Sequence, residues 1–232
     1  MSLLIPSYIR SAGILEDPIH HEWNESVKED LLLDQPRMTD RLSGMTHRAL
    51  LAFSLGSAEW VVWRLSKHLP DSVPFQLLEA AWAGTIDWRY LKSFDVPDWL
   101  GELPPPIGGP LDTAFWLLRE AFVAARDGEP FRHFSAALSK LVLQVVAKPE
   151  LYKEWRRFVI HRLTETYPRT QENRLGNPVP REALDPSYEY KPELANELLV
   201  RFLKALDYAQ NRYLRSPDEM ITAGFKGTPY SL

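Results

Sequence analysis

The sequence predicts an all-α protein of about seven main helices, packed as helical hairpins in a bundle or a short α-solenoid-like stack, with a packed C-terminal tail. Apolar residues recur with helical spacing in most segments, and almost no segment alternates with a period of two. The 19 prolines fall mostly between apolar segments, where they begin or end helices. With 232 residues, 45% of them hydrophobic, the chain is expected to form one domain with a large core.

The predicted main helices are bounded by prolines, glycines and capping residues. They cover residues 16–33, 48–69, 73–92, 110–127, 130–147, 149–167 and 192–210. The first is expected to follow an irregular arm over 1–15, with Asp17 as its N-cap and Pro18 at its first position. A further helical region from about Arg37 is expected to lead into the second.

The second predicted helix, 48–69, is the most apolar stretch of helical length and is expected to be the spine of the stack. Leu51 and Leu55 mark a face that apolar residues broaden on both sides. Gly56 would let a neighbouring helix come close, although glycine costs about 1 kcal/mol of helix stability relative to alanine. We expect Glu59 on a narrow solvent-exposed strip; the alternative is a buried carboxylate that faces a cavity.

Proline and glycine also shape the middle of the chain. Residues 93–110 form a Pro-rich linker, whose Pro104–Pro106 run favours an extended path and marks a possible internal boundary. Pro110 is then expected to open a helix that Gly128 ends.

The two halves of the chain resemble each other in layout. AFSLGSAEWVVWRL leads to a helix that opens with Pro74-Phe75, and AFWLLREAFVAARDG leads to one that opens with Pro130-Phe131. Convergence explains this simply, because proline is common in the first turn of a helix. A true duplication would favour stacked helical hairpins.

The C-terminal third contains a loop and a tail of unusual composition. Residues 168–191 form a polar loop that is too long to be a mere connection. Ser216 is expected to cap a short helix over 217–223. Apolar side chains that include Phe225 and Tyr230 predict a tail that packs on the helices; the alternative is a segment that docks on a partner.

Composition argues against several classes of function. Without cysteine the chain has no disulfide, no thiol nucleophile and no cysteine-ligated metal. A net charge of −4 favours neither nucleic acid nor an anionic membrane, and no apolar run is long enough to span a bilayer. Glycine patterns of nucleotide-binding folds and the Gly-x-Ser-x-Gly elbow do not occur. No cofactor is expected, and the N-terminus does not resemble a signal peptide, so the expected location is cytoplasmic.

Potential metal ligands gather in the first predicted helix. They are Asp17, His20, His21 and Glu25. On a helix, Asp17, His21 and Glu25 would share one face, as residues that bind one ion often do. Further ligands, such as His47 or Glu59, would have to come from a second helix. An exposed acidic helix explains the same residues without a metal.

A basic surface is expected on the helix predicted over 149–167. Its proposed contact residues are Lys153, Arg156, Arg157, His161 and Arg162. Lys153, Arg157 and His161 align one helical turn apart. These residues are expected either to be partly neutralised by the acidic N-terminal region or to form a docking patch for an acidic protein.

Together these patterns favour a non-enzymatic protein-binding module whose partner carries charged surface patches. Bacterial immunity proteins, which neutralise toxins, and secretion-system adaptors are small helical proteins of this style, without any residue-level match to this chain. Aromatic anchors such as Phe225 and Tyr230 would enter the partner, and charged surfaces would orient it. The main alternative is a metal-dependent enzyme with its site inside the bundle. A structural subunit of an oligomer is a third hypothesis.

Overall fold

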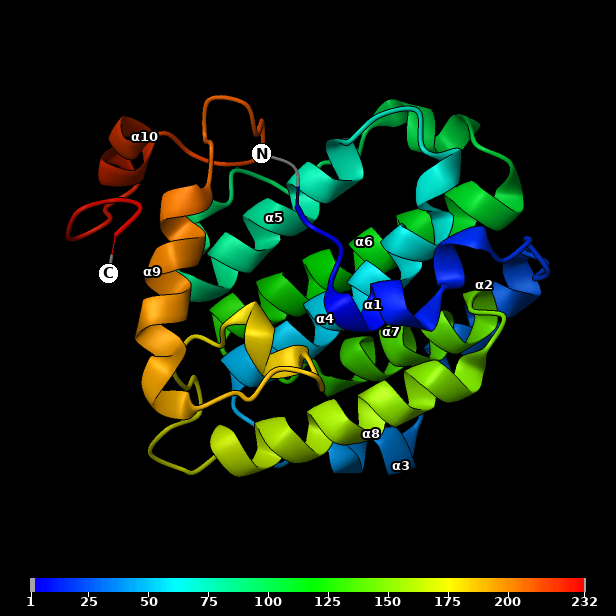
Figure 1. Ribbon diagram of the computed structural model, residues 1–232, viewed down its shortest axis with the longest axis horizontal. Coiled ribbons are helices and arrows are strands. Elements are labelled where there is room, and N and C mark those ends of the chain that lie inside the picture. The colour runs from blue at the N-terminus through cyan, green and yellow to red at the C-terminus, as the bar shows by residue number, and fades with distance from the viewer. Residues whose placement is uncertain (1–2, 232) are drawn as a thin grey trace.

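The computed structural model describes residues 3–231, which form helices and loops without a β-strand (Figure 1). Helices account for 64% of the chain. Within the described range, the seven helices of at least seven residues are α2 (Glu25–Leu32), α4 (His47–Leu65), α5 (Val73–Ile86), α6 (Pro105–Asp127), α7 (Arg132–Val145), α8 (Pro149–Thr166) and α9 (Ala195–Ala205). Shorter helices are α1 (Ser7–Ala12), α3 (Pro36–Arg41) and α10 (Pro217–Thr222). The all-α prediction with about seven main helices is confirmed.

Helix α4 lies at the centre of the molecule, as the stretch 48–69 predicted. It packs against α5, α6 and α7 (Figure 1). Nearly all of its side chains are buried. Thr46 caps its first turn by accepting a hydrogen bond from the backbone N–H of Ala49. Because α4 contacts helices from both halves of the chain, the arrangement is a bundle around one central helix. A solenoid differs, since each repeat there contacts only its neighbours.

A close approach explains the glycine in the middle of α4. A Cβ atom at Gly56 would lie 2.5 Å from Cδ2 of Leu184 and 2.9 Å from the ring of Trp155. Leu184 belongs to η5 (Arg181–Leu184), a short 3₁₀-helix in the long loop after α8. Gly56 therefore lets this loop and α8 pack directly on the central helix, as the sequence suggested for a neighbouring helix.

We expect Gly56→Ala to destabilise the protein although alanine is the better helix former. Overpacking costs about 1–3 kcal/mol, which outweighs the roughly 1 kcal/mol gained in helix propensity. Urea unfolding followed by circular dichroism measures the difference. Gly101→Ala is the matched control, since a Cβ atom there meets nothing within 4 Å. A Gly56→Ala variant as stable as the wild type would show that the loop does not pack tightly on α4.

The N-terminal predictions were partly wrong. The arm contains a helix, α1, which ends at Gly13 with a left-handed φ of 64°. The helix predicted from residue 16 begins only at Glu25, where the side chain of Asn24 accepts a hydrogen bond of 3.0 Å from the backbone of Val27. Residues 18–24 run as an irregular segment against α6, where Trp23 packs so closely on Gly109 that a Cβ atom there would clash.

The Pro-rich segment is more helical than predicted. Pro105 begins α6 and Pro110 lies inside it, whereas an extended path was expected for the proline run. Pro110 lacks the N–H that would bond to the carbonyl four residues earlier, which belongs to Pro106. That carbonyl instead accepts a hydrogen bond of 2.7 Å from Nε2 of His21. A contact from outside the helix thus compensates for the proline.

One hydrophobic core extends from Leu3 to Met220 and includes residues on both sides of 93–110. The internal boundary suggested at 93–110 stays a prediction. No helix in the described part of the chain is both long and apolar enough to cross a membrane.

The C-terminal tail packs on the helices, as predicted. The rings of Tyr90 and Tyr230 lie 5.1 Å apart, and the backbone N–H of Tyr230 donates a hydrogen bond of 3.1 Å to the hydroxyl of Tyr90. Ser216 caps α10 in a reciprocal capping box with Glu219, which confirms the predicted cap. Helix α9 is shorter than expected, because the chain leaves the helix at Leu206.

Candidate functional site

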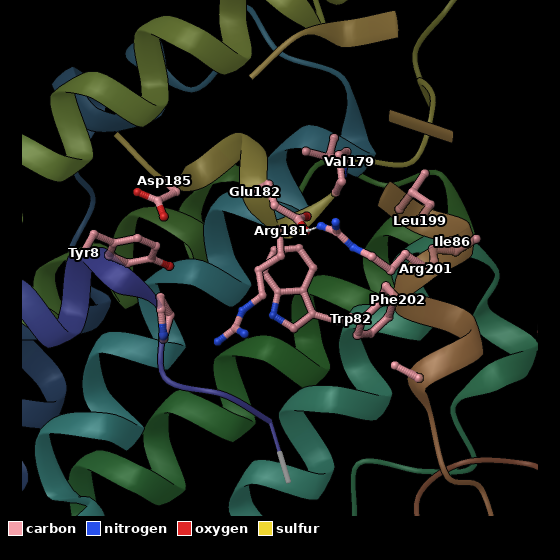
Figure 2. Close-up of a pocket in the computed structure, with 13 residues that line it drawn as sticks. Tyr8, Trp82, Ile86, Val179, Arg181, Glu182, Asp185, Leu199, Arg201 and Phe202 are labelled. Atoms are coloured by element: carbon pink, nitrogen blue, oxygen red, sulfur yellow. Dashed lines mark hydrogen bonds and ion pairs between the residues drawn. The ribbon is translucent and has the colours of Figure 1, made fainter. Parts of the chain in front are cut away.

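A cavity of about 260 Å³ opens where α1, the end of α5, η5 and α9 meet (Figure 2). Its walls are mostly apolar, with a few charged side chains. They comprise Pro6, Tyr8, Trp82, Ile86, Val179, Pro180, Arg181, Glu182, Asp185, Leu199, Arg201, Phe202 and Ala205. Binding sites for small molecules are typically concave, largely apolar and equipped with a few convergent polar groups, and this cavity has those properties.

Behind the cavity wall lies Glu59, whose side chain is completely buried. Its Oε1 atom accepts hydrogen bonds of 2.7 Å from Nε1 of Trp82 and 2.7 Å from Nε of Arg181. Its Oε2 atom accepts one of 3.2 Å from the hydroxyl of Tyr8. All three donors belong to residues that line the cavity, so Glu59 fixes their positions.

The expectation that Glu59 lies on a solvent-exposed strip was therefore wrong. Helix α4 is surrounded by other parts of the chain and keeps almost no exposed face. A carboxylate can stay buried only where hydrogen bonds and an opposite charge compensate for lost hydration. Arg181 supplies the charge, and Trp82 and Tyr8 complete the set of donors.

The carboxylate acts also on Tyr8. Burial raises the pKa of the Tyr8 hydroxyl well above its ordinary value, and the neighbouring negative charge of Glu59 raises it further. Tyr8 therefore stays protonated at physiological pH and remains a hydrogen-bond donor. Its ring stacks on Trp155 with a centroid distance of 5.3 Å, which anchors α1 over the junction of α4 and α8.

Arg181 carries the least satisfied polar group of the site. Its Nε atom pairs with Glu59, while its buried Nη2 atom has no hydrogen-bond partner among residues 3–231. About 20% of its side chain is exposed. A buried donor without an acceptor is uncommon in folded proteins.

A second ion pair and a fixed loop complete the cavity. Nη2 of Arg201 on α9 lies 2.6 Å from Oε1 of Glu182 on η5, so the pair links two walls (Figure 2). Arg162 on α8 donates hydrogen bonds to the carbonyls of Ala183, Asp185 and Tyr188. These bonds hold η5 and the residues after it against α8, so this wall of the cavity is preformed.

The arrangement is suited to recognition. Three of the four acceptor positions of Glu59 are occupied by protein donors, so the carboxylate orients its neighbours and has little left to offer a substrate. Asp185 is similarly engaged, since it accepts hydrogen bonds from Ser7 and Ser187. The free resources of the cavity are its apolar surface and the exposed fifth of the Arg181 side chain.

The proposed metal ligands lie in a different environment from the one expected. Asp17 and His21 are not on a helix, and Nε2 of His21 is bonded to Pro106. Oδ1 of Asp17 lies 3.7 Å from Nζ of Lys148. Burial lowers the pKa of His21, and the neighbouring His20 and the buried Arg64 lower it further. These cations oppose the binding of another cation. His20 lies beside His21, and Glu25 is exposed at the start of α2. Among the described residues, no three side chains of metal-binding type are placed to hold an ion.

The proposed basic contact residues share α8, and two of them, Arg156 and Arg162, are engaged within the protein, while the other three are exposed. Arg156 donates to the hydroxyl of Ser139, and Arg162 holds the η5 loop and covers the ring of Phe158. Lys153 pairs with Glu150 at 3.2 Å, and His161 lies 3.3 Å from Glu165. Arg157 is exposed. Phe225 and Tyr230, the proposed anchors, both pack against Tyr90.

Sequence reasoning missed Tyr8, Trp82 and Arg181 as residues of a site. The available signal was Glu59 itself, because a carboxylate inside so apolar a helix requires partners. Nothing local to Glu59 indicates which residues those partners are. Comparisons with known protein families, with curated proteins and with solved structures find no match to this chain.

Proposed function

We propose that this protein binds a small, mostly apolar molecule in the cavity beside Glu59. The observation that carries this proposal is that a fully buried carboxylate holds three cavity-lining side chains, Tyr8, Trp82 and Arg181, in fixed positions. Preorganised polar groups around an apolar cavity favour ligand binding, because the protein loses little freedom when the ligand arrives. The sequence-based expectation was a non-enzymatic protein-binding module, and it stays a prediction beside this proposal.

The cavity walls define the chemistry of the ligand. Its volume of about 260 Å³ lies just below the roughly 300 Å³ at which typical ligand sites begin, so the ligand is small. Trp82, Ile86 and Phe202 favour an aromatic ring or a compact aliphatic body. The two positive charges of Arg181 and Arg201 face three acids, Glu59, Glu182 and Asp185, which disfavours an anionic ligand. A neutral, mostly apolar molecule fits best.

Two other functions were expected from the sequence, a protein-binding module and a metal-dependent enzyme. The protein-partner hypothesis loses support on α8, because Arg156 and Arg162 are engaged within the protein. No observation among the described residues favours the metal-dependent enzyme.

Binding should be detectable by saturation-transfer difference NMR with indole, p-cresol and benzamide as probes. We expect at least one of them to bind, and we expect Ala205→Trp to weaken its binding about tenfold or more, since Ala205 lines the cavity and a large side chain there would occupy it. Lys204→Trp is the matched control, because it adds the same side chain at the neighbouring exposed position of α9, away from the cavity wall. Equal binding by both variants, or no binding of any probe, would refute the proposal.

A further inference from the structure

A series of adjoining hollows follows the exposed side of α6. Three hollows within residues 3–231 have volumes of about 300, 250 and 230 Å³. The first two share Leu32 and Trp116, and the first and third share Phe94 and Arg119. They therefore adjoin one another along α6, and the surface that they form is here called the α6 groove, defined by Leu32, Phe94, Trp116, Arg119, Val123 and Phe134.

The α6 groove gathers large apolar side chains that are open to solvent. Leu32 is 49% exposed, Leu33 63%, Trp88 46% and Val123 40%, and all of them line it. Single exposed apolar residues are normal on a protein surface, whereas a contiguous patch indicates an interaction site. Trp116 and Val123 are seven residues apart on one side of α6, so the apolar surface extends over about two turns.

Cations outnumber acids among the residues that line the α6 groove. Most of its charged lining residues are cations, namely Lys28, Lys92, Arg119, Arg126 and Arg215, against the acids Asp34 and Asp112, although the chain has a net charge of −4. Some of these cations pair with acids beside the groove, as Arg119 does with Glu120 at 2.9 Å. Lys92 and Arg126 likewise pair with Glu219 and Asp127. Exposed pairs of this kind contribute about 0–1 kcal/mol, so a partner's carboxylate replaces them at little cost.

We propose that the α6 groove docks an acidic amphipathic helix of another protein. Apolar side chains of that helix would fill the hollows around Trp116, and its carboxylates would face Arg119 and Lys28. A second copy of this chain fits less well. In a two-fold symmetric dimer formed through the α6 groove, the cations of one groove would face the same cations of the other molecule and repel them. This surface is separate from the cavity beside Glu59, so refuting one of the two proposals would leave the other unaffected.

The test uses a synthetic helical peptide with leucine and phenylalanine on one face, glutamate on the other and a fluorescent label. A second peptide carries lysine in place of every glutamate. Fluorescence anisotropy is expected to show that the full-length protein binds the glutamate peptide more tightly. Val123→Asp should weaken that binding about tenfold and Arg119→Glu about fivefold, and both variants should fold normally because both side chains are exposed.

Arg157→Glu is the matched control for Arg119→Glu. It reverses the same charge on an exposed part of α8, outside the α6 groove, and should leave binding unchanged. Loss of binding in this control alone would restore the basic surface of α8 as the docking patch and overturn the proposal. Failure to bind the glutamate peptide, or equal binding by all variants, would overturn it as well. Light scattering that shows a dimer which Val123→Asp dissociates would assign the α6 groove to a second copy of the chain.

Discussion

Glu59→Gln is expected to lower the free energy of unfolding by about 3 kcal/mol. Removing one partner of a buried ion pair typically costs about 3–5 kcal/mol, because the remaining charge is left without compensation. The lower end applies here, since about 20% of the Arg181 side chain still reaches solvent. Glutamine also places an amide N–H₂ group where one carboxylate oxygen accepted a hydrogen bond, so Tyr8 or Trp82 loses its acceptor. This expectation reverses the small effect that an exposed Glu59 would have shown.

Urea unfolding monitored by circular dichroism measures this loss, with Glu150→Gln as the control. Glu150 forms an exposed pair with Lys153, so its replacement should change stability by less than about 1 kcal/mol. The double variant Glu59→Gln with Arg181→Met should recover part of the loss, because it removes both charges together. If Glu59→Gln proved as mild as Glu150→Gln, the ion pair would not be buried in solution.

Trp60→Ala is expected to cost about 3–5 kcal/mol, the range for deleting a large aromatic side chain from a core. Trp60 is 1% exposed and is surrounded by Tyr152, Trp155 and Tyr8, with ring centroids 5.5, 6.0 and 6.1 Å away. No single neighbour can fill the space that the indole leaves. Thermal unfolding by calorimetry shows the effect as a lower Tm. Trp88→Ala, at a position 46% exposed, is the control and should change Tm little; equal effects of the two substitutions would contradict the buried position of Trp60.

Much of the fold was predictable because helices depend on local patterns. The apolar spacing around Leu51 and Leu55 identified the central helix, and Ser216 identified the cap of α10. Helix boundaries were predicted wrongly where a residue can have two roles. Pro110 can open a helix or, with an outside donor for the carbonyl of Pro106, lie within one.

The candidate site was not predictable, because its contacts join distant parts of the chain. The sequence shows that Glu59 is unusual, but its partner Arg181 lies 122 residues away. His21 suffered the same ambiguity: its spacing with Asp17 suggested a metal ligand, whereas its actual partner is a carbonyl 85 residues further on. Only the packed structure assigns such side chains to their partners.

The distance between Glu59 and Arg181 along the chain has a consequence for biosynthesis. A ribosome that adds about 5–20 residues per second delivers Arg181 roughly 6 to 24 s after Glu59, since 122 residues separate them. During that interval the nascent central helix carries a carboxylate without its counter-charge, so it cannot enter its final dry surroundings. Complete closure of the bundle must therefore wait until η5 has left the exit tunnel. Until then the face of the central helix that carries Glu59 lacks its final cover, although α5, α6 and α7, which precede η5 in the chain, already supply the other main packing partners of that helix.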